Sequence, residues 1–235
     1  MKKLILSCLA LYALAGLAGC TNVPDTLVYA SWDKLPEDTR EFFGDFFEGD
    51  LEKGEYFYRS YFMKFNPVHE VSHSLRAVYG VDATLYDEEQ SVNDITVAYW
   101  REIGEEEFID SLEVILLECL RGMKNPVPEG ENPRDFFNEN YHNLGDDPGL
   151  YGYFQFTFVL NSIGKTESFH SALEQNLTSA ARMKKSGMVF EPLPVESVDP
   201  PEVVENFRKY LELHNIHAPE IKFKNKFRTT IQSIN

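Results

Sequence analysis

The segment NPVHEVSHSLRAVYG, residues 66–80, carries the clearest structural pattern in the chain. Its large apolar residues recur at intervals of three or four positions: Val68, Val71, Leu75 and Val78. This spacing predicts a helix with one face in the core. Asn66 can cap the helix, and Pro67 suits the first helical position because its missing N–H has no helical partner there. Gly80 is a typical residue at a helix end.

Two histidines in this segment, His69 and His73, lie four residues apart in an HExxH pattern. On a helix, such residues lie one above the other, so both imidazoles can hold one Zn²⁺ at about 2.0–2.1 Å. Glu70 lies beside them and can accept a proton from a water that the metal activates. The segment therefore predicts a mononuclear zinc site with Glu70 as its general base. The alternative is a pair of solvated or hydrogen-bonded histidines without a metal.

A second helix is predicted to follow from Asp87, because Gln90 three residues later completes a variant of the capping box. Its apolar residues fit one face: Val92, Ile95, Tyr99 and Ile103. The first turns of this helix contain the sequence Glu89-Gln90-Ser91-Val92-Asn93. The metzincin extension of HExxH is absent, because Arg76 and Tyr79 occupy the positions of its Gly and His.

An HExxH helix followed by this pattern resembles the glutamate-zincins, which include thermolysin-like and ImmA/IrrE-like zinc metallopeptidases. The resemblance covers residues 66–102, about a sixth of the chain. It implies Glu89 as the third zinc ligand and Asn93 as support for a histidine or a backbone group. Glu88 is a second candidate ligand, and Glu102 or the glutamates at 105–107 are others. Glu88 and Glu89 also fit a simpler role as first-turn acids favoured by the helix dipole.

Peptide hydrolysis, which the resemblance implies, also needs a hydrogen-bond donor for the developing oxyanion. The sequence between residues 138 and 158 is rich in Tyr, Phe and Asn and could line a cleft. No single donor is favoured among the candidates: Tyr141, His142, Tyr151, Tyr153 and His170.

The first 20 residues differ from the rest of the chain in charge and hydropathy. Two lysines precede an apolar run, Leu4–Leu17, that is too short for an ordinary membrane-spanning helix. The run ends in Leu17-Ala18-Gly19-Cys20, which resembles the lipobox of a bacterial lipoprotein signal peptide. The resemblance implies cleavage of residues 1–19, acylation of Cys20 and a membrane-anchored place in the bacterial cell envelope, outside the cytoplasm. A plain secretory signal or an uncleaved anchor is the alternative.

Residues 20–35 are predicted to form a tether with a short strand at residues 27–29, followed by a single zincin-like domain over 36–235. We expect a mainly α fold, with α+β possible and a few short strands. Residues 55–65 are aromatic and fit either a helix or a strand. Further helices are predicted near 36–47, 105–121, 133, 148–163, 166–180 and after Asp199. The tail predicts either a terminal strand with a basic side or a frayed end, from Ile221, Phe223 and Phe227 alternating with basic residues.

The formal net charge is −16. Without Lys2 and Lys3 it becomes about −18, from 20 basic and 38 acidic residues. Such a charge repels phosphate backbones, so nucleic acid is not an expected partner. Cys119 is the only cysteine after Cys20 and lies in an apolar helical pattern, which predicts a buried structural thiol and no intramolecular disulfide.

These features predict a lipid-anchored zinc metallopeptidase that acts on a peptide or protein. One alternative is a non-catalytic surface lipoprotein, a binding or scaffold domain with a degenerate or chance HExxH motif. Another is a zinc hydrolase that acts on a substrate other than a peptide. The sequence indicates neither the substrate nor the oligomeric state.

Overall fold

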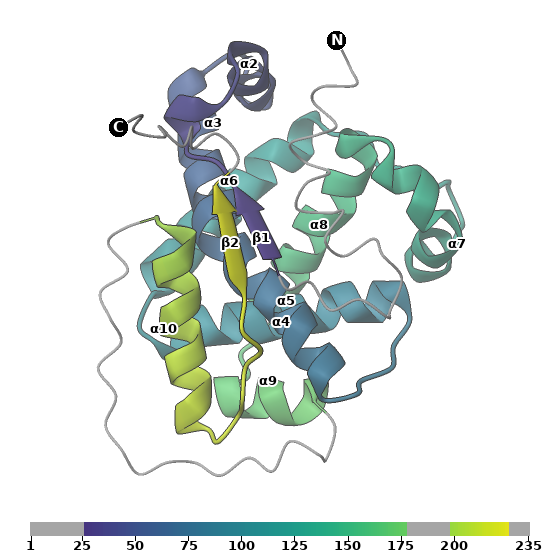
Figure 1. Cartoon of the computed structure of the whole chain (residues 1–235). Helices are drawn as coiled ribbons and strands as arrows, with labels where there is room; N and C mark the ends of the chain where they lie inside the picture. Colours follow the sequence, from purple (N-terminus) through teal and green to yellow (C-terminus); the bar gives the residue numbers. More distant parts are fainter. Residues whose placement is uncertain (1–25, 178–197, 226–235) are drawn as a thin grey trace, which may run out of the picture.

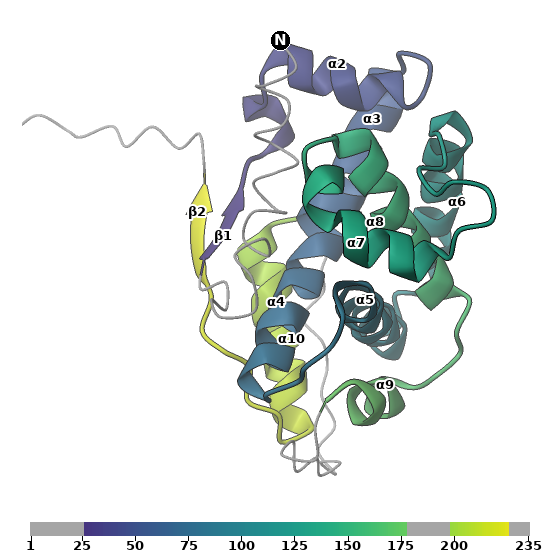
Figure 2. The same cartoon turned by 90° about the vertical axis from the view of Figure 1, so that its right-hand side faces the viewer.

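The computed structural model describes residues 26–177 and 198–225. The fold is mainly α, as predicted, with one small sheet (Figure 1). The helices are α2 (Glu37–Asp45), α3 (Leu51–Tyr58), α4 (Asn66–Val78), α5 (Leu85–Glu102), α6 (Glu106–Gly122), α7 (Pro133–Gly145), α8 (Pro148–Ile163), α9 (Phe169–Asn176) and α10 (Pro200–Leu213). The strands are β1 (Thr26–Tyr29) and β2 (Lys222–Asn225). Figure 2 shows the strands on one side, α7 and α8 on the other, and α4 between them.

One continuous helical run joins α3 to α4 through a π-helical segment, Arg59–Phe65. The ambiguous residues 55–65 are therefore helical. The predicted helix start at Asn66 is wrong: Phe65 before it is already helical, and no side chain caps α4. The Asn66 N–H instead donates to the carbonyl of Tyr61, five residues back. Proline inside a helix lacks an N–H and crowds the preceding turn. The wider π turns before Pro67 let the chain stay helical.

Helix α5 begins earlier than predicted, at Leu85. Thr84 is its cap, and the Thr84 hydroxyl accepts a hydrogen bond from the backbone N–H of Asp87. Asp87 is therefore in the first turn and is not the cap. The predicted starts of α7 and α8 are confirmed, because Asn132 and Asp147 accept from the first N–H groups of these helices. Helix α9 begins at Phe169, capped by Ser168, and α10 begins directly after Asp199 as predicted.

The predicted tether is wrong from residue 26 onward. Its short strand is confirmed as β1, but four apolar residues of 26–35 are buried in the main core: Leu27, Ala30, Trp32 and Leu35. The Tyr58 hydroxyl also donates to the carbonyl of Ala30 at 2.7 Å. Apolar burial therefore holds this segment on the body of the protein.

The predicted terminal strand is confirmed as β2, which pairs in parallel with β1 in the register Thr26↔Lys222 to Tyr29↔Asn225. Several predictions lie outside the described residues: the signal peptide 1–19, Cys20, residues 20–25, Ala180, the linker 191–197, and Lys226, Phe227 and Arg228.

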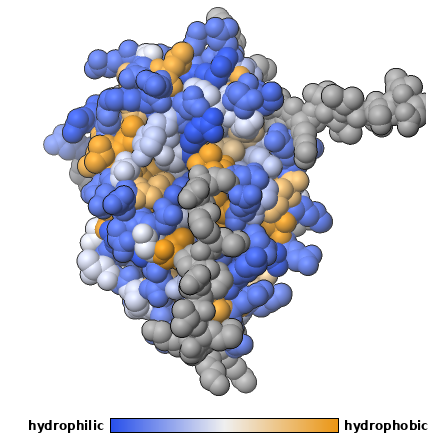
Figure 3. All heavy atoms as spheres, turned by 90° about the vertical axis from the view of Figure 1, so that its left-hand side faces the viewer, coloured by the Kyte–Doolittle hydropathy of each residue, from blue (hydrophilic) through white to orange (hydrophobic). Residues whose placement is uncertain are grey.

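The described helices enclose one large hydrophobic core and a smaller one. The smaller core lies between α7 and α8 and contains Phe137, Tyr141, Leu144, Phe154 and Phe158. Cys119 is buried in the main core with a free thiol, as predicted. The face in Figure 3 is mostly hydrophilic with small separate hydrophobic areas. Among the described residues, no helix has both the length and the apolar character needed to cross a membrane.

Candidate metal centre

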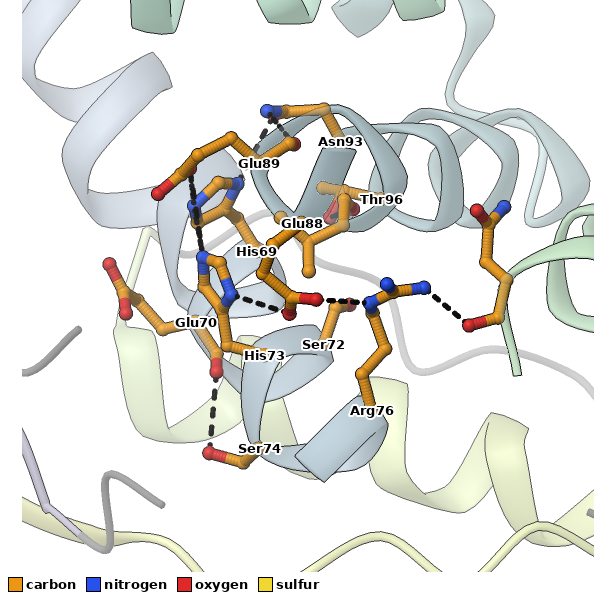
Figure 4. Close-up of polar contacts among 12 residues, drawn as sticks. His69, Glu70, Ser72, His73, Ser74, Arg76, Glu88, Glu89, Asn93 and Thr96 are labelled. Carbon is orange, nitrogen blue, oxygen red and sulfur yellow. Dashed lines mark hydrogen bonds and ion pairs between the residues drawn. The ribbon is translucent and has the colours of Figure 1, made fainter. Parts of the chain in front are cut away.

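The candidate centre lies where α4 packs against α5 (Figure 4). Helix α4 supplies His69, Glu70 and His73, and α5 supplies Glu88 and Glu89. His69 and His73 are one helical turn apart, so their rings extend from the same face of α4. Glu89 is in the first turns of α5 and extends toward both rings. The structure therefore brings the predicted ligand from the second helix to the HExxH pair.

Three donor atoms converge at this point. The Nε2 atoms of His69 and His73 are 3.1 Å apart. Oε2 of Glu89 lies 3.5 Å from Nε2 of His69 and 3.7 Å from Nε2 of His73. Ligands at 2.0–2.1 Å from a tetrahedral zinc are separated by about 3.3–3.4 Å. The triangle of donor atoms therefore has the dimensions of one face of a tetrahedral zinc site.

The outer hydrogen bonds set the chemistry of the two imidazoles. Nδ1 of His69 is 3.2 Å from the amide oxygen of Asn93, and Nδ1 of His73 is 3.0 Å from Oε1 of Glu88. Nδ2 of Asn93 donates to the backbone carbonyl of Glu89. This bond fixes the side-chain amide of Asn93 with its oxygen toward His69. Both partners accept, so each ring carries its proton on Nδ1 and presents the lone pair of Nε2 to the centre.

Two lone pairs and a carboxylate oxygen face one another in this arrangement, with no donor among them. Only a shared cation, either a metal ion or a proton, makes such a donor set favourable. The pKa of His73 lies well above its usual value. Burial by itself would lower this pKa, but the facing carboxylates of Glu89 and Glu88 outweigh the effect of burial. These residues fit a zinc ion by their donor types, their spacing and the direction of their lone pairs.

Glu89 is held by two side chains of α8. Nε2 of Gln155 donates to Oε2 of Glu89 at 3.0 Å, and the Tyr151 hydroxyl donates to Oε1 at 3.4 Å. Burial alone would raise the pKa of Glu89, but the imidazoles of His73 and His69 hold it below its usual range. Glu89 is therefore a charged, fixed carboxylate in a nearly closed environment.

Glu70 lies next to His73 and outside the triangle of donor atoms (Figure 4). Nδ2 of Asn66 donates to its Oε1 at 3.3 Å. Burial raises the pKa of the Glu70 carboxyl, and the nearby imidazoles oppose this increase. A buried carboxylate with a raised pKa, next to a metal centre, is the form that a general base requires.

The other candidate ligands lie outside the donor triangle. Glu88 faces away from the donor triangle and bonds to Nδ1 of His73 and to Arg76. Glu102 accepts from the hydroxyl of Tyr210, and Glu105 pairs with Lys64. The structure thus places Glu89 at the Nε2 atoms of both histidines, whereas Glu88 contacts only the outer nitrogen of His73.

Of the five candidate oxyanion donors, Tyr151 contacts the centre through its hydroxyl, which donates to Glu89. Tyr141 meets Tyr151 edge to face in the smaller core, and Tyr153 packs on Phe154. His142 is exposed, and His170 pairs with Glu174 on α9.

Two residues near the centre, Gln155 and Tyr61, were not predicted from the sequence. Gln155 follows Tyr151 by one helical turn, a spacing that places both on one face of α8. Tyr61 is buried, and burial, followed by the charges of Glu89 and Glu70, raises its pKa. No sequence pattern marked Tyr61, because it lies in an aromatic run that also fills the core.

The chain was compared with protein-family models, with curated proteins and with solved structures, and none of the three comparisons found a match.

Proposed function

We propose that this protein is a zinc-dependent hydrolase that cleaves peptide bonds. The observation that supports the proposal is the triangle formed by His69, His73 and Glu89, with Glu70 beside it. When bound, zinc would polarise a substrate carbonyl and make a water molecule more acidic. Peptide bonds are the proposed substrate because the HExxH and Glu89–Asn93 patterns resemble those of the glutamate-zincins.

Each residue of the candidate centre has its own role in the proposed reaction. His69, His73 and Glu89 would hold the ion. Asn93 and Glu88 fix the direction of the two imidazoles through Nδ1. Glu70 would take a proton from the attacking water at its carboxylate and return it to the leaving amine. A pKa above the usual carboxyl value makes Glu70 a stronger base for this proton.

Glu70→Gln tests this role because it keeps the size of the side chain and removes its basicity. We expect the variant to bind zinc like the wild type and to cleave a peptide library at least about 100-fold more slowly. Glu129→Gln is the matched control, because Glu129 is an exposed loop residue and should keep full activity. Equal cleavage rates for Glu70→Gln and the wild type would contradict the proposal.

The proposal includes a lipid anchor at Cys20 and a place in the bacterial cell envelope. Its support is the lipobox-like sequence Leu17-Ala18-Gly19-Cys20 after an apolar run. We expect Cys20→Ser to move the protein from the membrane fraction to the soluble fraction of the producing bacterium. An unchanged distribution would remove the anchor from the proposal and leave the zinc site untouched.

One observation favours a second candidate, a non-catalytic lipoprotein that uses zinc for stability. Three residues of the centre are closed off from solvent, with His69 4%, Glu89 5% and Glu70 6% exposed. Catalytic zinc needs a position that substrate can reach, whereas structural zinc is fully enclosed. A protein that contains zinc but cleaves no member of a peptide library would support this second function.

A further inference from the structure

A chain of hydrogen bonds leads outward from His73 across three helices (Figure 4). Nδ1 of His73 bonds to Oε1 of Glu88 at 3.0 Å. The other oxygen of Glu88 accepts from Nε of Arg76 at 2.8 Å. Nη1 of Arg76 donates to the backbone carbonyl of Asn176, the last residue of α9. The chain thus begins at the candidate metal centre and ends at the C-terminus of another helix.

Arg76 is 3% exposed, so its charge is almost fully removed from water. A buried guanidinium is costly unless its donors are satisfied by well-placed partners. Glu88 provides the opposite charge, and the C-terminal carbonyl of α9 is a favourable site for a cation. The planar fork of arginine reaches both partners at once, which the single ammonium of lysine cannot do with the same geometry.

The two histidines are therefore held in different ways. His69 is held by Asn93, whose amide is itself fixed within α5 by the carbonyl of Glu89. His73 is held by Glu88, whose second oxygen depends on Arg76 from α4 and, through Arg76, on α9. The direction of the His73 ring thus depends on the packing of three helices.

We propose that Arg76 is a positioning residue for His73: by holding Glu88, it directs Nε2 of His73 toward His69 and Glu89 and so sets the affinity for zinc. This inference rests on the zinc site of the proposed function. It adds that the docking of α9 contributes to metal binding, although α9 supplies no ligand.

Zinc affinity of the full chain, measured by competition with a chelating dye, tests the inference. Arg76→Lys keeps the charge but loses the fork, and we expect about 10-fold weaker binding. Glu88→Gln should weaken binding by about 10- to 100-fold. Because Arg76 acts through Glu88, the double variant should bind zinc no more weakly than Glu88→Gln alone.

Arg101→Lys is the matched control. Arg101 donates to the carbonyls of Lys165 and Ile163 at the end of α8, the same kind of contact without a link to the centre. Its zinc affinity should equal that of the wild type. Urea unfolding of each metal-free variant separates a positioning role of Arg76 from a purely structural one. If the role is purely structural, Arg76→Lys should lower the free energy of unfolding without changing the zinc affinity of the folded protein.

Wild-type zinc affinity in Arg76→Lys would overturn the inference, as would losses in the two single variants that add fully in the double variant. If Arg76→Lys does not fold, the Co²⁺ absorption spectrum of Glu88→Gln tests the inference instead. The inference requires this spectrum to differ from that of the wild type, and an identical spectrum would overturn it. A wild-type protein that binds no zinc would refute both the inference and the proposed function. A protein that binds zinc without cleaving peptides would refute the proposed peptidase activity alone.

Discussion

Replacing Glu89 by Gln changes the charge of the third ligand and little else. The amide has almost the same size, and it can still accept the hydrogen bond that Gln155 gives to the carboxylate. The fold should therefore survive the change. The carboxylate oxygen lies within 3.7 Å of both Nε2 atoms, so its charge is a direct part of the site that would hold zinc.

The expected size of the effect follows from ligand binding to the folded state. Zinc at 100 times its dissociation constant should raise the free energy of unfolding of the wild type by about 2.7 kcal/mol. For a chain of this size, that corresponds to an increase in Tm of about 5–11 °C. If Glu89→Gln weakens binding 100-fold, the same zinc concentration should add only about 0.4 kcal/mol, or about 1–2 °C.

Thermal unfolding, followed by circular dichroism, measures the shift. The protein is first stripped with a chelator and then titrated with zinc. Glu41→Gln is the control, because Glu41 is an exposed glutamate on α2 and its variant should show the full wild-type shift. A wild-type Tm that does not respond to zinc, or a full shift in Glu89→Gln, would refute the three-ligand site.

Two predictions concern the core. Gly54→Ala should lower the free energy of unfolding by about 1–3 kcal/mol in a urea titration, because an added Cβ would lie 2.8 Å from the backbone N of Gly44. Gly122→Ala meets nothing within 4 Å and should change stability by less than about 1 kcal/mol, so equal losses would count against this account. Burial raises the pKa of Cys119 to about 12 from its unfolded value of 9.0, so the thiol contributes stability that is complete below pH 9 and lost as the pH rises to 12. The stability advantage of the wild type over Cys119→Ala should therefore narrow across that range in urea titrations, and a constant difference would contradict the shift.

Local sequence patterns predicted correctly those features that depend only on residues close together in the chain. The spacing of His69 and His73 put both rings on one helical face, because four residues make about one turn. Asn132 and Asp147 marked two helix starts, because a cap accepts from N–H groups two or three residues away. Glu89 and Asn93 were expected beside the histidines only through the resemblance to glutamate-zincins, and their contacts with the rings had to be seen in the structure.

Contacts between residues far apart in the sequence decided the features that local patterns did not predict. The sequence around Asn66 and Pro67 fits a helix start, yet the aromatic residues before it pack in the core and keep the chain helical through a π segment. The residues after Thr26 fit a tether, yet burial of Leu27 and pairing with β2 hold them on the body. Strand partners almost 200 residues apart leave no local signal.

The sequence by itself determined the donor types of the candidate centre and the helix that carries two of them. Only the tertiary structure decided that Glu89, rather than Glu88, faces the two imidazoles, because this depends on how α5 packs across α4. The tertiary structure also decided which residues hold the glutamates in place. Gln155 on α8 donates to Glu89, and Arg76 joins Glu88 to the end of α9. The physical reason is that helical periodicity fixes the directions of side chains within one helix, whereas apolar packing between helices fixes which side chains meet.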